Sequence, residues 1–416
     1  MRLLASSLLL SLLSVAACGG SDRGGFADAE GTPPPAASSG GPAGPFAGGG
    51  GATPAGVVAT LTGTVKAPNG QMPIAGALVY LTRERPAPNP TQVYCDGCVQ
   101  LAHGTPHALA DASGRFELGA TALGAQFLVV QKGGFRRVRE IYVSKGKAPL
   151  PETLTTLPPK TDLAQSDEVP KMAVVHGAYD EIEASLAKLG IDPSAIELVQ
   201  SALVGKAARE FLTDQARVMK EHIIFLPCGD FTQPAPNTDL SQDPTILENL
   251  RTFVAAGGRL YTTDWHYDFV ARAFPGYVSW VGASAAPCSG CERVAYDAAA
   301  TVADPGLSAW LGAQSLTSFT LQRNYTSVAS VSSVATVDAD GNPKTVTPKV
   351  WVRGARDGAA PRPATVTFEN GCGRVLFSTY HTEPSSLALT PQERTLLGVL
   401  LETSVCVGSE SGVILK

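Results

Sequence analysis

The sequence predicts a multidomain protein in which a β-sandwich precedes an α/β domain with a doubly wound parallel sheet. The chain has 416 residues, 44% of them hydrophobic, which is enough for two or three domains. Short strand patterns recur at regular spacing over residues 57–150, as in a small sandwich. Continuous apolar strands alternate with helical patterns over residues 169–408, which indicates a parallel sheet covered on both faces.

Residues 1–18 have the pattern of a signal peptide that ends at a cysteine. Arg2 precedes an apolar run of 11 residues, which is too short for a membrane span of about 20. The segment ending Val15-Ala16-Ala17-Cys18 resembles the lipobox of bacterial lipoproteins. The resemblance implies cleavage before Cys18 and acylation of its thiol with chains such as palmitate. An ordinary secretory signal with an incidental cysteine is the alternative.

This resemblance implies a bacterial cell-envelope protein whose membrane partner is lipid, reached through acylated Cys18. Two or more acyl chains anchor a protein firmly, whereas one does not. Gly19 and Gly20 follow the cysteine in place of an acidic residue, which by resemblance to the enterobacterial sorting rule favours the outer membrane. The net charge is −5 and the chain has no basic run, so we expect no nucleic-acid partner. We also expect no cofactor.

Two segments have the composition of linkers. Residues 19–56 are dominated by Gly, Ala, Pro and Ser, and such a segment cannot bury enough apolar surface to order itself. A flexible coil of this length spans roughly 35 Å, which suits a tether between the membrane and the folded part. Residues 151–168, rich in Pro and Thr, are expected to form a second linker between the two domains.

The expected sandwich over residues 57–150 contains strands at 57–65, 77–81, 127–131 and 136–144, and a turn that leads into a strand at 110–118. Gly63-x-Val65, the segment at 73–81 and Ala110-Asp111-x-x-Gly114-x-Phe116 resemble the carboxypeptidase regulatory-like domain. The resemblance implies a transthyretin-like sandwich with a structural or adhesive role and no catalytic residues.

The expected α/β domain over residues 169–408 contains buried strands at 172–175, 223–226, 259–263 and 374–379. Helical spacing covers residues 181–189, 207–220, 246–256 and 391–403. Residues 280–370 interrupt this alternation with an insertion of mixed character. The run at 223–226, the helix that ends at Gly257-Gly258, and Gly373 leading to His381-x-Glu383 resemble the class I glutamine amidotransferase-like superfamily and its ThuA-like branch. That resemblance implies a flavodoxin-like fold.

Polar side chains follow each of these buried strands. In doubly wound sheets ligands bind beyond the carboxyl ends of the strands, so we expect these side chains to line one ligand cleft. The expected cleft residues are His176, Tyr179, Asp180, Cys228, Asp230, Asp264, Trp265, His266, His381 and Glu383. Polar loop residues without a ligand are the alternative.

The same cleft lacks the expected nucleophile. The resemblance implies a cysteine on a tight elbow after a strand, with a later His-x-Glu that supplies a base and its orienting carboxylate. His381 and Glu383 match the second half, but the elbow falls at Asp264, where no Cys or Ser stands. The catalytic candidates are therefore only His381, Glu383 and Asp264. These groups, with His176 and His266, also suit Zn²⁺, but no tight spacing supports a metal, and we assign none.

Seven cysteines remain beside Cys18, and disulfides are the default in an exported protein. The Cys-x-x-Cys spacing predicts local disulfides Cys95–Cys98 and Cys288–Cys291, with zinc binding or redox activity as alternatives. A strand from residue 374 to 380 rises roughly 23 Å, and a helix from 391 to 404 returns roughly 21 Å, which predicts a Cys372–Cys406 disulfide. Cys228 is then the free thiol.

Together these features predict a membrane-anchored envelope lipoprotein without catalytic activity. Its sandwich acts as a spacer, and its α/β domain binds a glycan, a small molecule or a protein. The missing elbow nucleophile motivates this interpretation. The alternative is an envelope hydrolase of the glutamine amidotransferase-like or ThuA-like type that acts on carbohydrate or amide substrates.

Overall fold

The computed structural model describes residues 56–95, 99, 101–200, 205–229, 239–337, 341–382 and 385–401. The predicted signal peptide with Cys18, and the expected tether apart from Gly56, lie outside these residues. In the described part of the chain, no helix is both long and apolar enough to cross a membrane.

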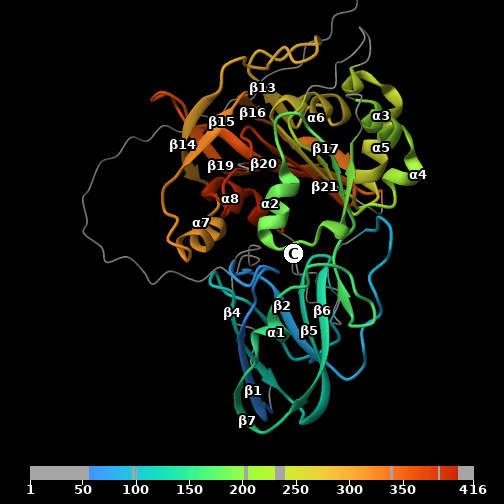
Figure 1. Cartoon of the computed structure of the whole chain (residues 1–416), viewed down its shortest axis with the longest axis vertical. Helices are drawn as coiled ribbons and strands as arrows, with labels where there is room; N and C mark the ends of the chain where they lie inside the picture. Colours follow the sequence, from blue (N-terminus) through green and yellow to red (C-terminus); the bar gives the residue numbers. More distant parts are fainter. Residues whose placement is uncertain are drawn as a thin grey trace, which may run out of the picture. The chain divides into compact units, whose positions relative to one another are not determined.

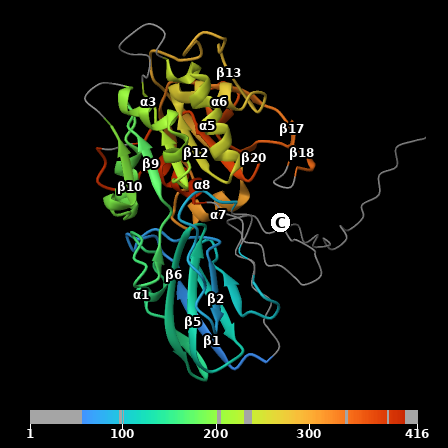
Figure 2. The same ribbon diagram turned by 90° about the vertical axis from the view of Figure 1, so that its right-hand side faces the viewer.

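The N-terminal region contains two sheets. The first has three strands in the order β4-β1-β7, with bounds Arg115–Ala120, Ala59–Thr64 and Gly146–Pro149. The second has five strands in the order β3-β2-β5-β6-β8, with bounds His107–Leu109, Leu78–Thr82, Gly124–Lys132, Phe135–Val143 and Asp167–Glu168. Figure 2 shows β2, β5 and β6 side by side.

Alternating side chains give this region its core. Leu61 on β1 and Leu118 on β4 share one buried cluster with Val79 on β2 and Leu128 on β5. Such alternation is expected where one face of a strand meets a core. The turn before β4 forms as the sequence predicts, because Asp111 Oδ1 accepts hydrogen bonds from the backbone N–H groups of residues 113 and 115.

The segment expected to be the second linker is part of this region. Residues 151–168 contain helix α1 (Glu152–Thr155) and strand β8, which pairs with β6. Asp167 on β8 lies 2.9 Å from Arg137 and 2.8 Å from Arg139, and Glu168 lies 2.9 Å from Arg136. Arginines on β6 thus hold in place a segment whose composition suggested a linker.

The C-terminal region is built on a nine-stranded sheet in the order β10-β9-β11-β12-β21-β20-β19-β14-β15. Its first five strands are parallel, with bounds Ile196–Val199, Met172–Val175, Ile223–Leu226, Arg259–Thr263 and Gly373–Ser378. The other four are antiparallel to their neighbours, with bounds Arg362–Asn370, Lys349–Ala355, Tyr296–Val302 and Thr320–Asn324.

The sheet is therefore mixed, which corrects the expectation of a purely parallel sheet. The insertion at 280–370 supplies β14, β15, β19 and β20 and lengthens the sheet beyond β21. Two small antiparallel pairs lie outside this sheet, β13 (Val278–Trp280) with β16 (Val328–Val331) and β17 (Val334–Val337) with β18 (Pro343–Val346). The short turn between β20 and β21 makes that pair antiparallel.

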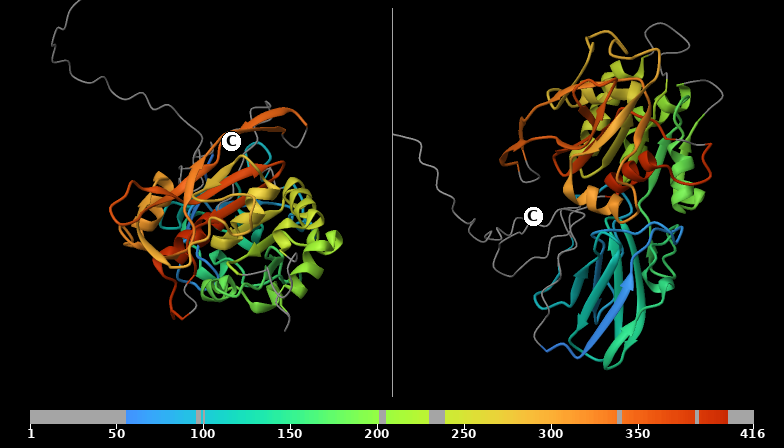
Figure 3. Two further views of the ribbon diagram at one scale, coloured as in Figure 1. Left: turned by 90° about the horizontal axis from the view of Figure 1, so that it is seen from above. Right: turned by 90° about the vertical axis from the view of Figure 1, so that its left-hand side faces the viewer.

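Helices cover both faces of the sheet (Figures 1 and 3). One face packs on α2 (Ile182–Leu189), α7 (Pro305–Gly312) and α8 (Pro391–Leu400). The other packs on α3 (Lys206–Thr213), α5 (Pro244–Ala255) and α6 (Tyr267–Ala273), with α4 (Gln215–Val218) beside α5. Along β11, Ile223 and Phe225 face the first group and Ile224 and Leu226 the second.

Capping side chains explain several helix boundaries. Asp243 accepts hydrogen bonds at the start of α5, and Thr390 forms a capping box with Glu393 at the start of α8. The helix expected over residues 207–220 is two helices, because Asp214 ends α3 and caps α4. The described residues also contain three short 3-10 helices: η1 (Pro193–Ala195), η2 (Leu240–Gln242) and η3 (Asp264–His266).

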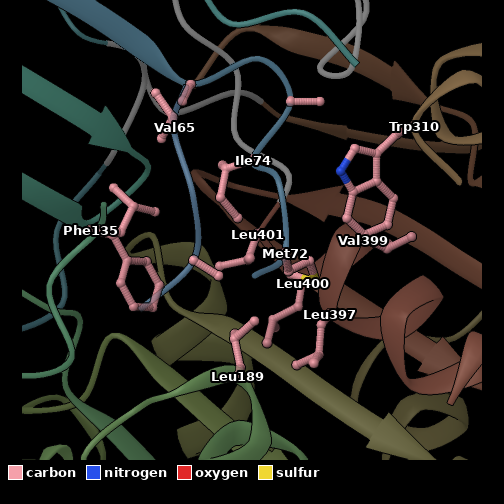
Figure 4. Packing of buried hydrophobic residues seen from close by; sticks show 14 of the residues in the cluster. Val65, Met72, Ile74, Phe135, Leu189, Trp310, Leu397, Val399, Leu400 and Leu401 are labelled. Carbon is pink, nitrogen blue, oxygen red and sulfur yellow. The ribbon is translucent and has the colours of Figure 1, made fainter. Parts of the chain in front are cut away.

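Loops of the N-terminal region share a buried cluster with helices of the C-terminal region. Val65, Met72 and Ile74 belong to the same cluster as Leu189 on α2 and Trp310 on α7 (Figure 4). The Trp310 indole N–H donates to the carbonyl oxygen of Pro73 at 2.9 Å.

A disulfide also crosses between the regions, and it replaces two predicted pairs. Cys95 is bonded to Cys372, so neither Cys95–Cys98 nor Cys372–Cys406 forms; Cys98 and Cys406 lie outside the described residues. Cys372 N donates to Ala255 O at the end of α5. Gly257, two residues after Ala255, lies very close to Tyr94. A Cβ atom on Gly257 would lie 1.9 Å from the Tyr94 carbonyl oxygen. The approach of the 93–95 segment to this corner brings the two sulfurs together.

Candidate functional site

The loops after β9, β11, β12 and β21 meet at one edge of the sheet. Asp180, from the loop after β9, accepts hydrogen bonds from Thr263 Oγ1 at 2.8 Å and from the Thr382 backbone N–H at 2.9 Å. The Thr382 hydroxyl also donates to it. Thr263 Oγ1 in turn accepts from the Cys228 backbone N–H at 2.7 Å. This buried network joins all four loops through Asp180.

Asp264 and His381 are the closest pair of titratable groups at this edge. His381 Nε2 lies 3.0 Å from Asp264 Oδ2, and both side chains are 2% exposed or less. The Tyr325 backbone N–H donates to the same Oδ2 atom at 2.9 Å. Asp264 directly follows β12 and has a φ of +49°, a conformation that non-glycine residues adopt at a cost. A strained backbone turn therefore follows β12, and it carries a carboxylate.

Burial shifts the protonation of this pair. Burial raises the pKa of Asp264 to about 6, although the neighbouring His381 works in the opposite direction. Burial alone would lower the pKa of His381, but contact with the Asp264 carboxylate and the charge of Asp180 raise it above its usual value. The pKa values of both side chains are therefore raised above their ordinary values.

Cys228 completes a cluster with these two residues. One ligand atom from each of Cys228, Asp264 and His381 lies within 4.8 Å of the others. Cys228 is the only free cysteine among the described residues, and its side chain is buried. Burial, together with the charge of Asp264, raises the pKa of the thiol well above its usual value. A thiol held protonated in this way is a poor nucleophile.

Aromatic rings lie against the cluster. The Tyr325 ring stacks on His381 with centroids 5.3 Å apart, and Trp265 packs edge-on to Tyr325. Tyr179 packs edge-on to Trp265 at 5.4 Å, and the Arg293 guanidinium lies over the Trp265 ring at 5.1 Å. Tyr325 and Arg293 come from the insertion. The sequence of the insertion has no strand-end pattern, so nothing in it marks these two residues.

Not every predicted cleft residue joins this cluster. His176 is partly exposed and lies 3.4 Å from Glu183. His266 is buried, with Nδ1 3.3 Å from the Leu226 carbonyl oxygen. Tyr179 is 50% exposed. Asp230 and Glu383 lie outside the described residues, so the His-x-Glu pair is represented by His381 alone.

A cavity of about 230 Å³ opens beside the cluster. Its lining includes Trp265, His266, Asp239, Asp268, Cys288 and Arg293. Arg272 lies 3.4 Å from Asp239 and 3.5 Å from Asp268, and the Cys288 backbone N–H donates to Asp268 at 2.6 Å. The Cys288–Cys291 disulfide, the pair expected from the sequence, is present at this wall. Asp239 and Asp268 were not predicted because neither directly follows a buried strand.

No family model and no curated protein sequence matches this chain. Similar solved structures include a putative ThuA-like protein from Bacteroides uniformis, with a TM-score of 0.32 and 10% identity, covering 56% of this chain and 91% of that one. A cytoplasmic protein from Salmonella typhimurium has a TM-score of 0.32 and 14% identity, with coverage of 56% and 98%. A β-galactosidase from Rahnella sp. R3 has a TM-score of 0.31 and 12% identity, covering 58% of this chain and 32% of that one. At these values the likenesses assign no activity or ligand to this chain.

Proposed function

We propose that this protein is a lipid-anchored protein of the bacterial cell envelope that binds a ligand without converting it. The observation that carries the proposal is Asp264 at the elbow after β12, where an amidotransferase-like enzyme would need a thiol or hydroxyl nucleophile. Asp264 is fully buried, and the nearest thiol, Cys228, is buried too. The lipobox-like segment that ends at Cys18 supports the anchor.

The architecture is consistent with this proposal at each level. We assign the two N-terminal sheets to a carboxypeptidase regulatory-like β-sandwich that acts as a spacer. The five parallel strands run in the spatial order β10-β9-β11-β12-β21, the 2-1-3-4-5 order of flavodoxin-like sheets. In such sheets ligands bind beyond the carboxyl ends of the strands, which is where the Trp265 cavity lies.

The lining of this cavity favours a glycan or a similar polar small molecule. Trp265 supplies an aromatic face, and its indole N–H is buried without a hydrogen-bond partner among the described residues. Asp239 and Asp268 supply acceptors, and Arg293 supplies a cation. Sugars present both apolar ring faces and hydroxyl groups, so a tryptophan face beside carboxylates matches their chemistry.

A glycan panel tests this proposal with the full chain purified in detergent. We expect saturable binding in isothermal titration calorimetry, and a Trp265→Ala variant that binds roughly tenfold more weakly or worse. Tyr142→Ala is the matched control, because Tyr142 is 78% exposed on β6, in the N-terminal region. Recovery of the ligand unchanged supports binding without conversion. Equal binding by the Trp265→Ala variant would rule this cavity out.

The contact between Asp264 and His381 favours a second candidate, an envelope hydrolase acting on carbohydrate or amide substrates. A carboxylate on a strained elbow beside an imidazole is an arrangement that can perform nucleophilic or general-base chemistry. In that case Glu383 would orient His381. Turnover of any panel member that is abolished in Asp264→Asn but retained in His176→Ala would favour this candidate over the binding protein.

A further inference from the structure

Cys228, Asp264 and His381 form a buried cluster for which the proposed function supplies no role. They follow β11, β12 and β21, three neighbouring parallel strands, so the sheet itself fixes their spacing. Their ligand atoms lie within 4.8 Å of one another, and all three residues are 2% exposed or less. The cavity ligand would contact Trp265 and its neighbours, not these three side chains.

The unmet hydrogen-bonding capacity of the cluster is a second observation. Asp264 Oδ1 and His381 Nε2 are both buried atoms without a hydrogen-bond partner among the described residues. His381 Nε2 lies 3.0 Å from Asp264 Oδ2, so the two side chains meet inside the cluster. Unpartnered polar atoms are costly to bury, and this cluster leaves two of them within reach of one thiol.

The three side chains are a suitable ligand set for one metal ion. A thiolate, an imidazole and a carboxylate together suit Zn²⁺, which binds them at about 2.0–2.3 Å. A tetrahedral ion with these bond lengths holds its ligand atoms roughly 3.3–3.7 Å apart. The three ligand atoms lie within 4.8 Å of one another, so modest side-chain shifts would bring them to these distances.

The surroundings already hold two of the ligands in orientation. The Tyr325 backbone N–H donates to Asp264 Oδ2, and the Tyr325 ring stacks on His381. Gln392 on α8 donates to the His381 carbonyl oxygen at 2.7 Å. Partners of this kind orient metal ligands in characterised sites. Asp180 fixes the loops from which the ligands project, through its bonds to Thr263 and Thr382.

We propose that Cys228, Asp264 and His381 bind a divalent transition-metal ion, with Zn²⁺ the best match to the donor set. Binding releases the proton of the Cys228 thiol and any proton carried by His381 Nε2 or Asp264 to the solvent, and the imidazole then binds through its unprotonated Nε2. The three ligands leave a fourth position for water or another donor. The proposal goes beyond ligand binding in the Trp265 cavity and requires no ligand there.

Cobalt substitution tests the site directly. The full chain, purified in detergent with its disulfides intact and stripped with a chelator, is titrated with Co²⁺. We expect one equivalent to produce a thiolate-to-cobalt charge-transfer band and the strong visible bands of a tetrahedral centre, both abolished by excess Zn²⁺. In Cys228→Ser the charge-transfer band is lost, and in His381→Ala the affinity falls by about a hundredfold or more. His176→Ala, a partly exposed histidine outside the cluster, should behave like the parent protein.

The parent protein alone can decide the question if a variant fails to fold. A folded parent chain that gives no cobalt–thiolate band, and whose melting temperature does not rise with Zn²⁺, overturns the proposal. So does a Cys228→Ser variant that folds and keeps the charge-transfer band, since the thiolate must then belong to another cysteine. Because no glycan takes part in this experiment, its failure leaves the binding proposal untouched.

Discussion

The disulfide between Cys95 and Cys372 joins two segments that lie 277 residues apart in the chain. Cys95 belongs to the excursion between β2 and β3, and Cys372 to the turn between β20 and β21. Val93, in the same excursion, donates its backbone N–H to Met219 O at 3.1 Å. The disulfide therefore links the N-terminal region to the edge of the C-terminal region at which α5 ends.

Removal of this disulfide should destabilise the whole described fold. Because it closes a very long loop, the double variant Cys95→Ser/Cys372→Ser should lose about 2–5 kcal/mol of unfolding free energy, measured by denaturant titration. The control is Cys288→Ser/Cys291→Ser, which opens a loop of only three residues' separation and should lose less. Equal losses in the two variants, or a disulfide map with Cys95 joined to Cys98, would contradict the assignment.

Local patterns in the sequence predicted the elements nearest the site well. Residues 223–226 and 259–263 are strands β11 and β12 with the expected bounds, because β11 is a continuous apolar run and β12 contains β-branched and aromatic residues that favour strands. The helix expected at 246–256 is α5, Pro244–Ala255, since Pro at its start and Gly after its end are strong boundary signals. These elements also placed Asp264 and Cys228 at strand ends.

Long-range pairings were not predictable in the same way. In β15 the exposed and buried residues follow no regular period, and the pairing of β15 with β14 shifts register, so neither this register nor the position of Tyr325 could be read from spacing. The Cys372–Cys406 prediction used only the lengths of adjacent elements. The real partner, Cys95, reaches Cys372 from another part of the chain, and no local pattern records that approach.

Lipid attachment is predicted to depend on a single residue, Cys18. Cells that express the chain and are fed labelled palmitate should yield a labelled protein in the membrane fraction. Cys18→Ala should lose the label and leave the membrane, because acylation at Cys18 provides the membrane-binding energy. Cys228→Ala, a buried cysteine, is the control and should remain labelled. A Cys18→Ala protein that stays labelled would refute the anchor.

Glu221 should make stability decrease with rising pH. Burial, assisted by the charge of Glu197, raises the pKa of Glu221 from 4.5 to about 7. Between these values the unfolded chain has released the proton while the folded chain keeps it, so stability falls through this window and stays low above it. Glu221→Gln should therefore be more stable than the parent above pH 7, by up to about 3 kcal/mol, and equal to it below pH 4.5. Exposed Glu181→Gln is the control, and a constant difference across the pH range would contradict this assignment.

Two helical glycines should respond in opposite directions to the same substitution. In an ordinary helix Gly→Ala stabilises by up to about 1 kcal/mol. Gly312, the last residue of α7, has open space around the position of a Cβ atom, so Gly312→Ala should follow that rule.

Gly398 in α8 is different, because a Cβ there would meet the Trp310 ring at 2.6 Å. Trp310 is held by its bond to Pro73 O and by the cluster in Figure 4, so it cannot retreat freely. Gly398→Ala should thus lower the melting temperature, by an overpacking cost of about 1–3 kcal/mol, while Gly312→Ala raises it. Stabilisation by both substitutions would show that α7 and α8 do not pack as described.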